Sequence, residues 1–163
     1  MGCNCGSKEN ILKIKYLDHY NLKLWGEMKY AMPGDACFDA KAAINHNIVI
    51  KHIKFNKVDR VIIPLGFKVE IPFGYEMQVR IRSGIAKKYG ITMSNGIGTI
   101  DSGYRGEVMA LISNLGIRNV IIEPGMRICQ CKIAEVPQFK LVSVSHLSET
   151  KRGKGGFGHT GDS

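Results

Sequence analysis

The sequence predicts a single all-β domain with one short helix, and two observations lead to this prediction. Apolar residues occupy every second position from Val61 to Ile81, between polar residues and Pro-Gly breaks. This period of two is typical of antiparallel strands with one buried face. Short apolar runs between glycine and proline turns follow, as in sandwiches and closed β folds. A length of 163 residues and an apolar fraction of 44% suit one domain with one core.

Further strands are expected on both sides of this alternating stretch. They are placed at residues 12–16, 48–55, 108–112, 120–122, 128–133 and 141–144. Turns are expected at Pro33-Gly34, Pro72-Phe73-Gly74 and Glu123-Pro124-Gly125. Residues 18–30 fit no single pattern, and the polar residues 1–10 are expected to form a flexible leader.

The one helix is expected at residues 83–90, where the alternation stops. Ser83 can cap its N-terminus and Gly90 can end it. A helix N-terminus favours an anion, and the neighbouring Arg82 would strengthen that preference. The alternative is a capped connector with a surface arginine, and this segment alone leaves both interpretations open.

Charge and cysteine content limit the partners and the compartment. The formal net charge of +9 favours anionic ligands. The basic residues are spread along the chain, which predicts a local phosphate site and no nucleic-acid partner. Neither a membrane-spanning apolar window nor a secretory leader is seen, so no membrane association is expected. The five cysteines lack zinc-finger spacing; Cys129 and Cys131 are expected to be core residues in a reducing compartment, the cytoplasm or the nucleus.

Residues 95–107 contain the densest group of candidate functional residues. Four glycines accompany an isolated carboxylate, Asp101, and an aromatic ring, Tyr104. Asn95-Gly96 is typical of a two-residue hairpin turn, and glycine lets backbone approach a ligand closely. Asp101 is therefore expected where a tight hairpin enters a packed strand. An ordinary surface hairpin is the alternative.

The C-terminal residues 151–161 combine five glycines with cations and one ring, Phe157. Such a segment is a disordered basic tail in many proteins. The alternative is an arm that folds over a planar phosphorylated ligand, with Phe157 stacked on a base and cations at the phosphates.

Taken together and in order, five segments resemble the five motifs of the trimeric dUTPase family, the deoxyuridine 5'-triphosphate nucleotidohydrolases. They are residues 33–39, 82–86, 95–107, 125–130 and 152–161. The resemblance implies a β jelly-roll, or β-clip, homotrimer whose three active sites lie at subunit interfaces. It divides the chain into a leader at 1–10, a β domain at 11–148 and an arm at 149–163 that closes over the site. It also implies hydrolysis of dUTP to dUMP and pyrophosphate, with Mg2+ on the phosphates and water.

The resemblance also implies a role for individual residues. Asp101 would orient the attacking water, and Tyr104 would pack under the deoxyribose and crowd out a ribose 2′-hydroxyl. The remaining roles are uracil reading by Asn95, Gly98, Thr99 and Ile100; phosphate binding by Arg82, Ser83, Gly84 and Gln130; stacking by Phe157; closure by Arg152, Gly158, His159 and Thr160; and support by Asp39 and Arg127.

The chain departs from the family pattern at a few positions. Cys37 and Phe38 replace a usual Gly-Tyr, Gly103 and Met126 stand where many members have an acid, and His159 replaces a usual serine. All of these departures leave Asp101 in place.

Two other functions compete with dUTP hydrolysis. A related dCTP deaminase would need a catalytic glutamate five residues after the glycine matching Gly106, where this chain has Leu111, which cannot move protons. That family also lacks the fifth motif. A binding or regulatory protein with the same fold is the second alternative, favoured by the +9 charge and by His159.

Overall fold

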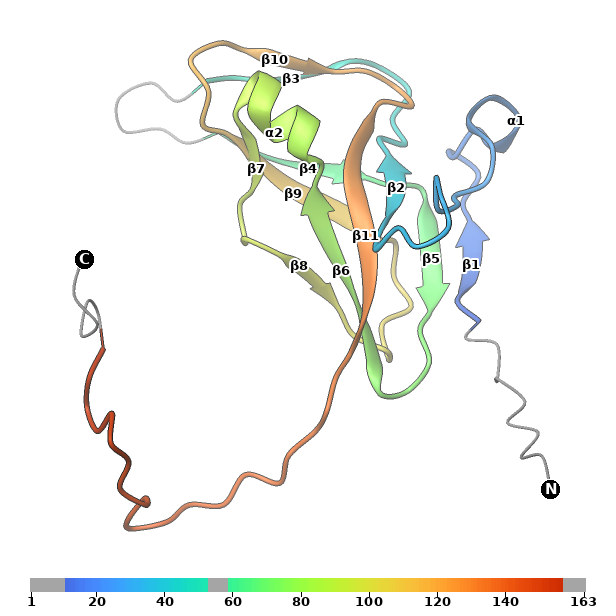
Figure 1. Cartoon of the computed structure of the whole chain (residues 1–163). Helices are drawn as coiled ribbons and strands as arrows, with labels where there is room; N and C mark the ends of the chain where they lie inside the picture. The colour runs from blue at the N-terminus through green and yellow to red at the C-terminus, as the bar shows by residue number, and fades with distance from the viewer. Residues whose placement is uncertain (1–10, 53–58, 157–163) are drawn as a thin grey trace, which may run out of the picture.

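The computed structural model describes residues 11–52 and 59–156, which form an antiparallel β structure with two short helices (Figure 1). The strands are β1 (Lys13–Tyr16), β2 (Phe38–Lys41), β3 (Ile48–Ile50), β4 (Arg60–Pro64), β5 (Phe67–Glu70), β6 (Tyr75–Ile81), β7 (Ile91–Met93), β8 (Gly98–Ile100), β9 (Met109–Asn114), β10 (Val120–Ile122) and β11 (Arg127–Glu135). The helices are α1 (Leu22–Trp25) and α2 (Ser83–Tyr89). None of the helices in the described ranges is long and apolar enough to cross a membrane.

The strands form four small antiparallel sheets. The largest has the order β2-β11-β6-β8, and a three-stranded sheet has the order β4-β9-β7. Two further pairs, β1 with β5 and β3 with β10, complete the arrangement. The short β7 and β8 flank the turn at Asn95-Gly96 but pair with different sheets. The predicted two-residue hairpin is therefore wrong: the turn carries the chain from one sheet to the other.

The predicted alternation from Val61 to Ile81 is confirmed by burial. On the predicted inner face, Ile63, Leu65, Phe67, Val69, Ile71, Met77 and Val79 are all buried. Val61, Tyr75 and Ile81 of the same face are only partly buried against the core. Phe73 departs most, with 85% of its surface exposed, because it lies in a turn where Gly74 has φ +86° and Tyr75 N–H bonds to the Pro72 carbonyl. Cys129 and Cys131 are buried in the same core, and burial raises the pKa of Cys129 to about 12, so both act as apolar core groups.

The helices differ from the prediction in number and in capping. The N-cap of α2 is Arg82, not Ser83, and its carbonyl accepts the N–H groups of Ile85 and Ala86. Ser83 is the first helical residue, and the cap at Arg82 has no side-chain hydrogen bond. Gly90 ends the helix with φ +70°, as predicted. The unpredicted α1 spans four residues after an Asn21 cap, too few to produce a helical period.

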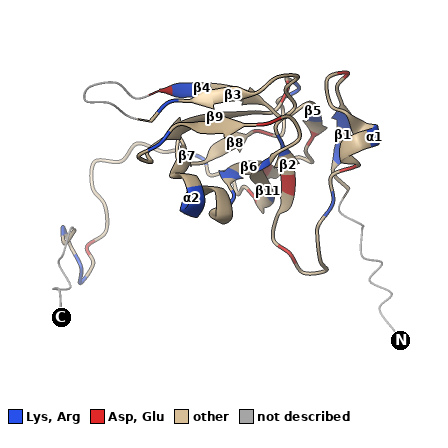
Figure 2. Cartoon of the chain, turned by 90° about the horizontal axis from the view of Figure 1, so that it is seen from above, with Lys and Arg blue, Asp and Glu red and all other residues tan. Residues whose placement is uncertain are grey.

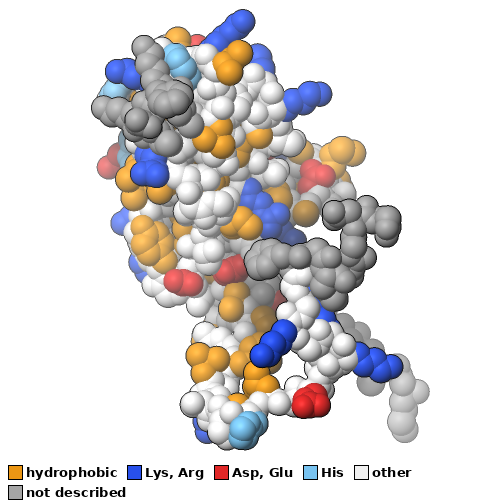
Figure 3. Space-filling model, turned by 90° about the vertical axis from the view of Figure 1, so that its left-hand side faces the viewer, with side chains coloured by type: hydrophobic (Ala, Val, Ile, Leu, Met, Phe, Trp, Pro, Cys, Tyr) orange, Lys and Arg blue, Asp and Glu red, His pale blue; other side chains and the backbone are white. Residues whose placement is uncertain are grey.

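Two predicted strands also differ from the structure. Residues 141–144 form no strand but part of an exposed segment that runs away from the sheets. In the described chain they have no neighbouring strand to pair with, and Leu141 is 93% exposed. Figure 3 shows hydrophobic side chains on this protruding segment. Of the strand predicted at 48–55, residues 48–50 are confirmed and residues 51–52 form no strand. Residues 53–55 and the predicted leader at 1–10 lie outside the described residues.

Candidate active site

A carboxylate held between two arginines forms the centre of the phosphate-site candidate. Arg82 Nε lies 2.9 Å from Asp39 Oδ1, and Arg127 Nη1 lies 3.2 Å from Asp39 Oδ2. Arg82 also donates to the Arg127 carbonyl at 3.2 Å. These two contacts use Nε and Nη1 of the Arg82 guanidinium. Neither of them uses Nη2.

Strand register explains why residues so far apart in sequence meet here. Gln130 on β11 is opposite Asp39 on β2 and opposite Arg80 on β6, so Asp39 and Gln130 share one row across the sheet. Arg82 follows β6 directly, and its N–H bonds to the Ile128 carbonyl. Figure 2 shows the acidic position of β2 beside the basic positions of the neighbouring strands. The structure therefore brings together four predicted residues: Asp39, Arg82, Arg127 and Gln130.

These four residues line a cleft of about 520 Å³ whose other wall is the N-terminal segment with Tyr20 and Trp25. Lys41 also lines it and donates to the Trp25 carbonyl. Burial, together with the charge of Arg127, lowers the pKa of Lys41, while Asp39 acts in the opposite direction. The cleft lining contains four cations, Lys29, Lys41, Arg82 and Arg127, and three carboxylates, Glu27, Asp35 and Asp39. Its cations outnumber its carboxylates by one, which favours an anionic ligand. Sequence reasoning missed Lys41, although its position two residues after Asp39 on β2 places it on the same face.

The turn before β8 and the strand itself form the candidate base-reading edge. Asn95 and Thr99 are exposed, and Gly96 has φ +73°. Gly98 is buried, and a side chain there would press on Met93 and Val79 at 3.3 Å, so glycine keeps this strand close to its neighbours. Backbone at the edge of a short strand can offer hydrogen bonds to a compact ring.

The loop after β8 carries the candidate catalytic residue, and hydrogen bonds within the loop hold its conformation. Asp101 is exposed, and its carbonyl accepts the Tyr104 N–H at 3.0 Å. The Tyr104 hydroxyl donates to the Glu107 carbonyl at 2.9 Å. Gly106 leaves room for this ring, because a Cβ there would lie 2.3 Å from the Tyr104 oxygen.

Asp101 and the Asp39 cluster lie at opposite ends of β6 in one chain. Ile100 pairs with Met77 near the start of β6, so Asp101 continues towards Glu76, whereas Arg82 follows the other end of the strand. Six strand residues span about 20 Å. Figure 1 shows β8 running towards the turn before β6, away from α2. A single described chain does not bring the carboxylate to the phosphate cleft.

The remaining predicted residues are only partly described. Ser83 and Gly84 are exposed at the start of α2, beside Arg82. Arg152 lies in the exposed terminal segment, where its Nε donates to the Gly155 carbonyl. Phe157, Gly158, His159 and Thr160 lie outside the described residues, so their predicted roles are not placed.

The chemistry of the cleft fits a magnesium ion carried mainly by a ligand. Glu27, Asp35 and Asp39 line the cleft. Within residues 11–52 and 59–156, however, no three His, Cys, Asp or Glu side chains gather closely enough to hold a metal. Magnesium retains waters and is often bound through one or two carboxylates plus phosphates, so this donor set suits an ion that arrives with a phosphorylated substrate.

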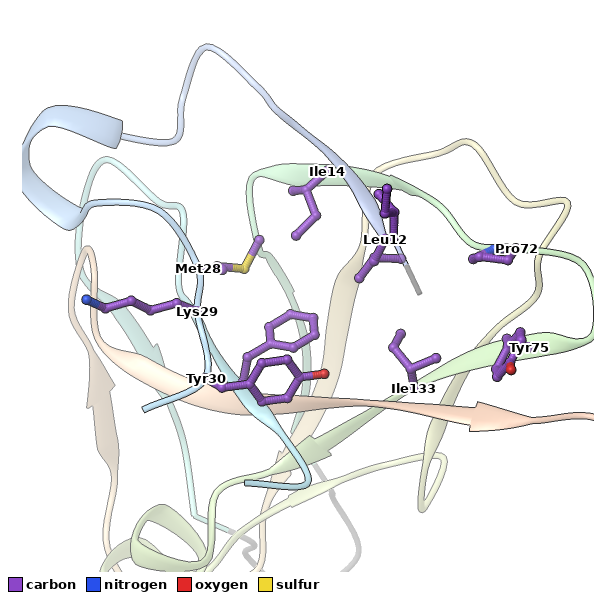
Figure 4. Close-up of a pocket in the computed structure, with 10 residues that line it drawn as sticks. Leu12, Ile14, Met28, Lys29, Tyr30, Pro72, Tyr75 and Ile133 are labelled. Atoms are coloured by element: carbon purple, nitrogen blue, oxygen red, sulfur yellow. The ribbon is translucent and has the colours of Figure 1, made fainter. Parts of the chain in front are cut away.

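A second hollow, of about 450 Å³, is apolar and lies beside β1 (Figure 4). Leu12, Ile14, Met28, Tyr75 and Ile133 point into it. It contains no predicted site residue, and its lining suits apolar side chains rather than a charged nucleotide.

Comparison with known proteins identifies the family. A family model described as dUTPase matches residues 25–161. The chain belongs to the dUTPase family. The deoxyuridine 5'-triphosphate nucleotidohydrolase of Chlamydia pneumoniae is 49% identical over 140 residues, which cover 85% of this chain and 93% of that relative. The protein of the same name from Fusobacterium nucleatum is 46% identical over 133 residues, covering 82% and 88%. The predicted family and enzyme class, a dUTP nucleotidohydrolase, are confirmed.

Solved dUTPase structures share the fold. The dUTPase of Staphylococcus bacteriophage 80alpha with dUpNHpp superposes with a TM-score of 0.79 at 24% identity, covering 93% of this chain and 99% of that one. A variant dUTPase of phage phi11 of S. aureus, which coordinates a structural Mg(II) ion, has a TM-score of 0.70 at 20% identity, covering 84% and 98%. These likenesses confirm the predicted dUTPase-like β fold.

Proposed function

We propose that this protein hydrolyses dUTP to dUMP and pyrophosphate, with Asp101 orienting the attacking water. The observation that carries the proposal is the Asp101–Tyr104 loop. It contains one exposed carboxylate and one exposed aromatic ring, and hydrogen bonds within the loop hold both. A triphosphate chain is already an activated anion, so its hydrolysis needs mainly positioning and charge stabilisation. One carboxylate that orients and deprotonates water completes this requirement.

The cleft around Asp39 would bind the phosphates of the substrate. Asp39 holds Arg82 and Arg127 in fixed orientations, and Gln130 lies in the adjacent position of β11. Charge-assisted hydrogen bonds from guanidinium groups to phosphate are short and strong. Ser83 and Gly84, exposed beside Arg82, would add donors at the same anion. Uracil would lie against Asn95 and β8, whose backbone can match its hydrogen-bonding edge.

The active site would form between copies of this chain in a homotrimer. About 20 Å of β6 separates Asp101 from Arg82 in one chain, yet an attacking water must lie within hydrogen-bond reach of its base. A neighbouring copy can supply the missing part. Apolar surface supports assembly: Phe139 and Leu147 are 81% and 87% exposed, and the hollow of Figure 4 is open.

A magnesium ion is part of the proposal as a companion of the triphosphate. Phosphate oxygens and water would hold it, near Asp39, and it would offset phosphate charge during attack. The segment from Arg152 onwards would close over the bound nucleotide. The buried thiols of Cys129 and Cys131 support a reducing compartment, the cytoplasm or the nucleus.

Pyrophosphate release from four nucleotides tests the proposal. The purified chain is incubated with magnesium and dUTP, dCTP, dTTP or UTP, and an Asp101→Ala chain purified in the same way measures background activity. We expect pyrophosphate from dUTP well above the other three. Equal release from all four, or none, would contradict the proposal. Ammonia release from dCTP would favour the deaminase, against the apolar Leu111.

A further inference from the structure

One side chain, Glu107, connects the candidate catalytic loop to two other parts of the chain. Its Oε1 accepts the Gly66 backbone N–H at 2.9 Å and lies 2.7 Å from His19 Nε2. Because an ionised carboxylate can only accept, His19 Nε2 is the donor in this contact. We propose that His19, Gly66 and Glu107 form a brace that positions Tyr104 and thereby sets the preference for deoxyribose over ribose. This inference rests on the proposed function of the loop.

The turn at Gly66, to which the brace is attached, is tightly packed. Gly66 lies between β4 and β5, and its carbonyl accepts the Leu17 N–H at 2.9 Å. A Cβ at Gly66 would lie 2.5 Å from the Ala43 side chain and 2.9 Å from that of Tyr20, so this turn packs directly against the segment that contains His19. Glu107 is 22% exposed and His19 is 43% exposed in their side chains. The Gly66–Glu107 hydrogen bond is partly buried, whereas the His19–Glu107 contact is exposed, so the bond to Gly66 is expected to contribute more to holding Glu107.

The path from the brace to the sugar runs through Tyr104. The Tyr104 hydroxyl donates to the Glu107 carbonyl at 2.9 Å, so fixing Glu107 fixes the acceptor that orients the ring. On the other side, Val108 N–H bonds to the Phe67 carbonyl, which continues the attachment to β5. A ring that discriminates a single hydroxyl must be held within a fraction of an ångström. Without the Glu107 carboxylate, residue 107 would lose its contacts with Gly66 and His19. The backbone carbonyl that accepts from Tyr104 would then be held less firmly.

Glu107 and His19 are positioning residues in this account, because neither is placed against the substrate. They predict a specific signature. Glu107→Ala, which removes both acceptor contacts, should lower the ratio of kcat/KM for dUTP over UTP by about tenfold, the equivalent of one charge-assisted hydrogen bond. Glu107→Gln keeps an acceptor for Gly66 and should restore most of the ratio. His19→Ala should have a smaller effect, and His19→Gln, which retains an N–H donor, should recover it.

The experiment measures hydrolysis of dUTP and UTP by the full chain and these variants. His46→Ala is the matched control, because His46 is hydrogen-bonded to its neighbour Asn45 and not to the brace; its ratio should equal the parent's. Combining His19→Ala with Glu107→Ala should give the ratio of Glu107→Ala alone, since both act through one brace. A Glu107→Ala ratio within about twofold of the parent, or additive effects in the double variant, would overturn the proposal.

A second measurement keeps the brace testable without catalysis. Amide hydrogen exchange of the peptide covering residues 101–107 should be faster in Glu107→Ala and His19→Ala than in His46→Ala. Unchanged exchange would overturn the brace. Fluorescence of Trp25, the chain's single tryptophan, reports whether each variant is folded; if Glu107→Ala unfolds, His19→Ala decides. If the unsubstituted protein did not hydrolyse dUTP, the proposed function would be refuted. Amide hydrogen exchange would still test whether the brace holds residues 101–107.

Discussion

The phosphate cleft and the Asp101 loop obtain their geometry in different ways. In the cleft, three strands fix Asp39, Arg82 and Arg127 by register, and side-chain ion pairs complete the arrangement. In the loop, an exposed stretch is held by its own backbone, by the Tyr104 hydroxyl and by Glu107. The cleft residues are held by a hydrogen-bonded sheet, whereas the loop depends on a few individual hydrogen bonds. Since the two lie at opposite ends of β6, neither alone forms an active site.

The largest effect is expected from the loop, because it carries the carboxylate proposed to orient the attacking water. Asp101→Asn is nearly isosteric but cannot accept a proton from water, so turnover should fall by about a thousandfold while dUTP binding is retained. Single-turnover kinetics and equilibrium binding measure the two separately. A loss of less than about tenfold would mean that another group activates the water.

Removal of the chain after Lys151 should have the next largest effect. Loss of a stacking ring and of phosphate donors should reduce turnover about a hundredfold. The unfolding temperature should barely change, because the described hydrogen bonds of residues 151–156 reach no farther than the adjacent Thr150. Calorimetry and kinetics on the same preparation check both statements. A large drop in unfolding temperature would show that the segment stabilises the β domain.

A smaller effect is expected in the cleft, where several cations share the phosphates. Arg82→Ala should weaken dUTP binding about thirtyfold, as for a lost charge-assisted hydrogen bond, and dUMP binding less. Arg82→Lys should recover only part of this, because lysine lacks the planar fork. Titration calorimetry with both nucleotides measures the difference, with the exposed Arg118→Ala as control. Equal losses for dUTP and dUMP would contradict a role at the outer phosphates.

The smallest effect is expected from Gly106→Ala, which changes no functional group. The new Cβ would meet the Tyr104 oxygen at 2.3 Å, so the ring must move, at a cost of about 1–3 kcal/mol. We expect a several-fold loss of kcat/KM for dUTP. Gly103→Ala, where a Cβ meets nothing within 4 Å, is the matched control and should behave like the parent. Equal behaviour of the two variants would show that the ring position tolerates this shift.

Much of the fold could be predicted because burial with a period of two is a local property of the sequence. The alternation from Ile63 to Val79 determined which side chains face the core. The four-residue α1 left no comparable signal, and the exposed residues 141–144 resemble a strand only in composition. Strand formation there would need a neighbour that the described chain does not provide.

The candidate site could be predicted as a set of residues but not as a geometry. The motifs singled out Asp39, Arg82 and Asp101, whose roles stay predictions. Arg82 and Asp39 are 43 positions apart in the sequence, and their ion pair depends on the register between strands. The contacts of Glu107 with His19 and Gly66 likewise join segments distant in sequence. No local pattern encodes such contacts, so Lys41 and the brace became visible only in the folded chain.

The central claim, that a working site combines the cleft of one copy with the Asp101 loop of another, has a direct test. Asp101→Asn chains, which turn over slowly, and Arg82→Ala chains, which bind dUTP weakly, are co-expressed with different affinity tags. Mixed assemblies are isolated through both tags and assayed at a dUTP concentration near the parent's Kd, where the Arg82→Ala cleft stays largely empty. In a mixed trimer, whichever variant is in excess, about one third of the sites should receive an intact cleft and an intact loop from different copies. We predict that dUTP hydrolysis returns to roughly that share of the parent's turnover. Mixed trimers of verified composition that stay as inactive as either variant would show that cleft and loop come from the same chain, and would contradict the account.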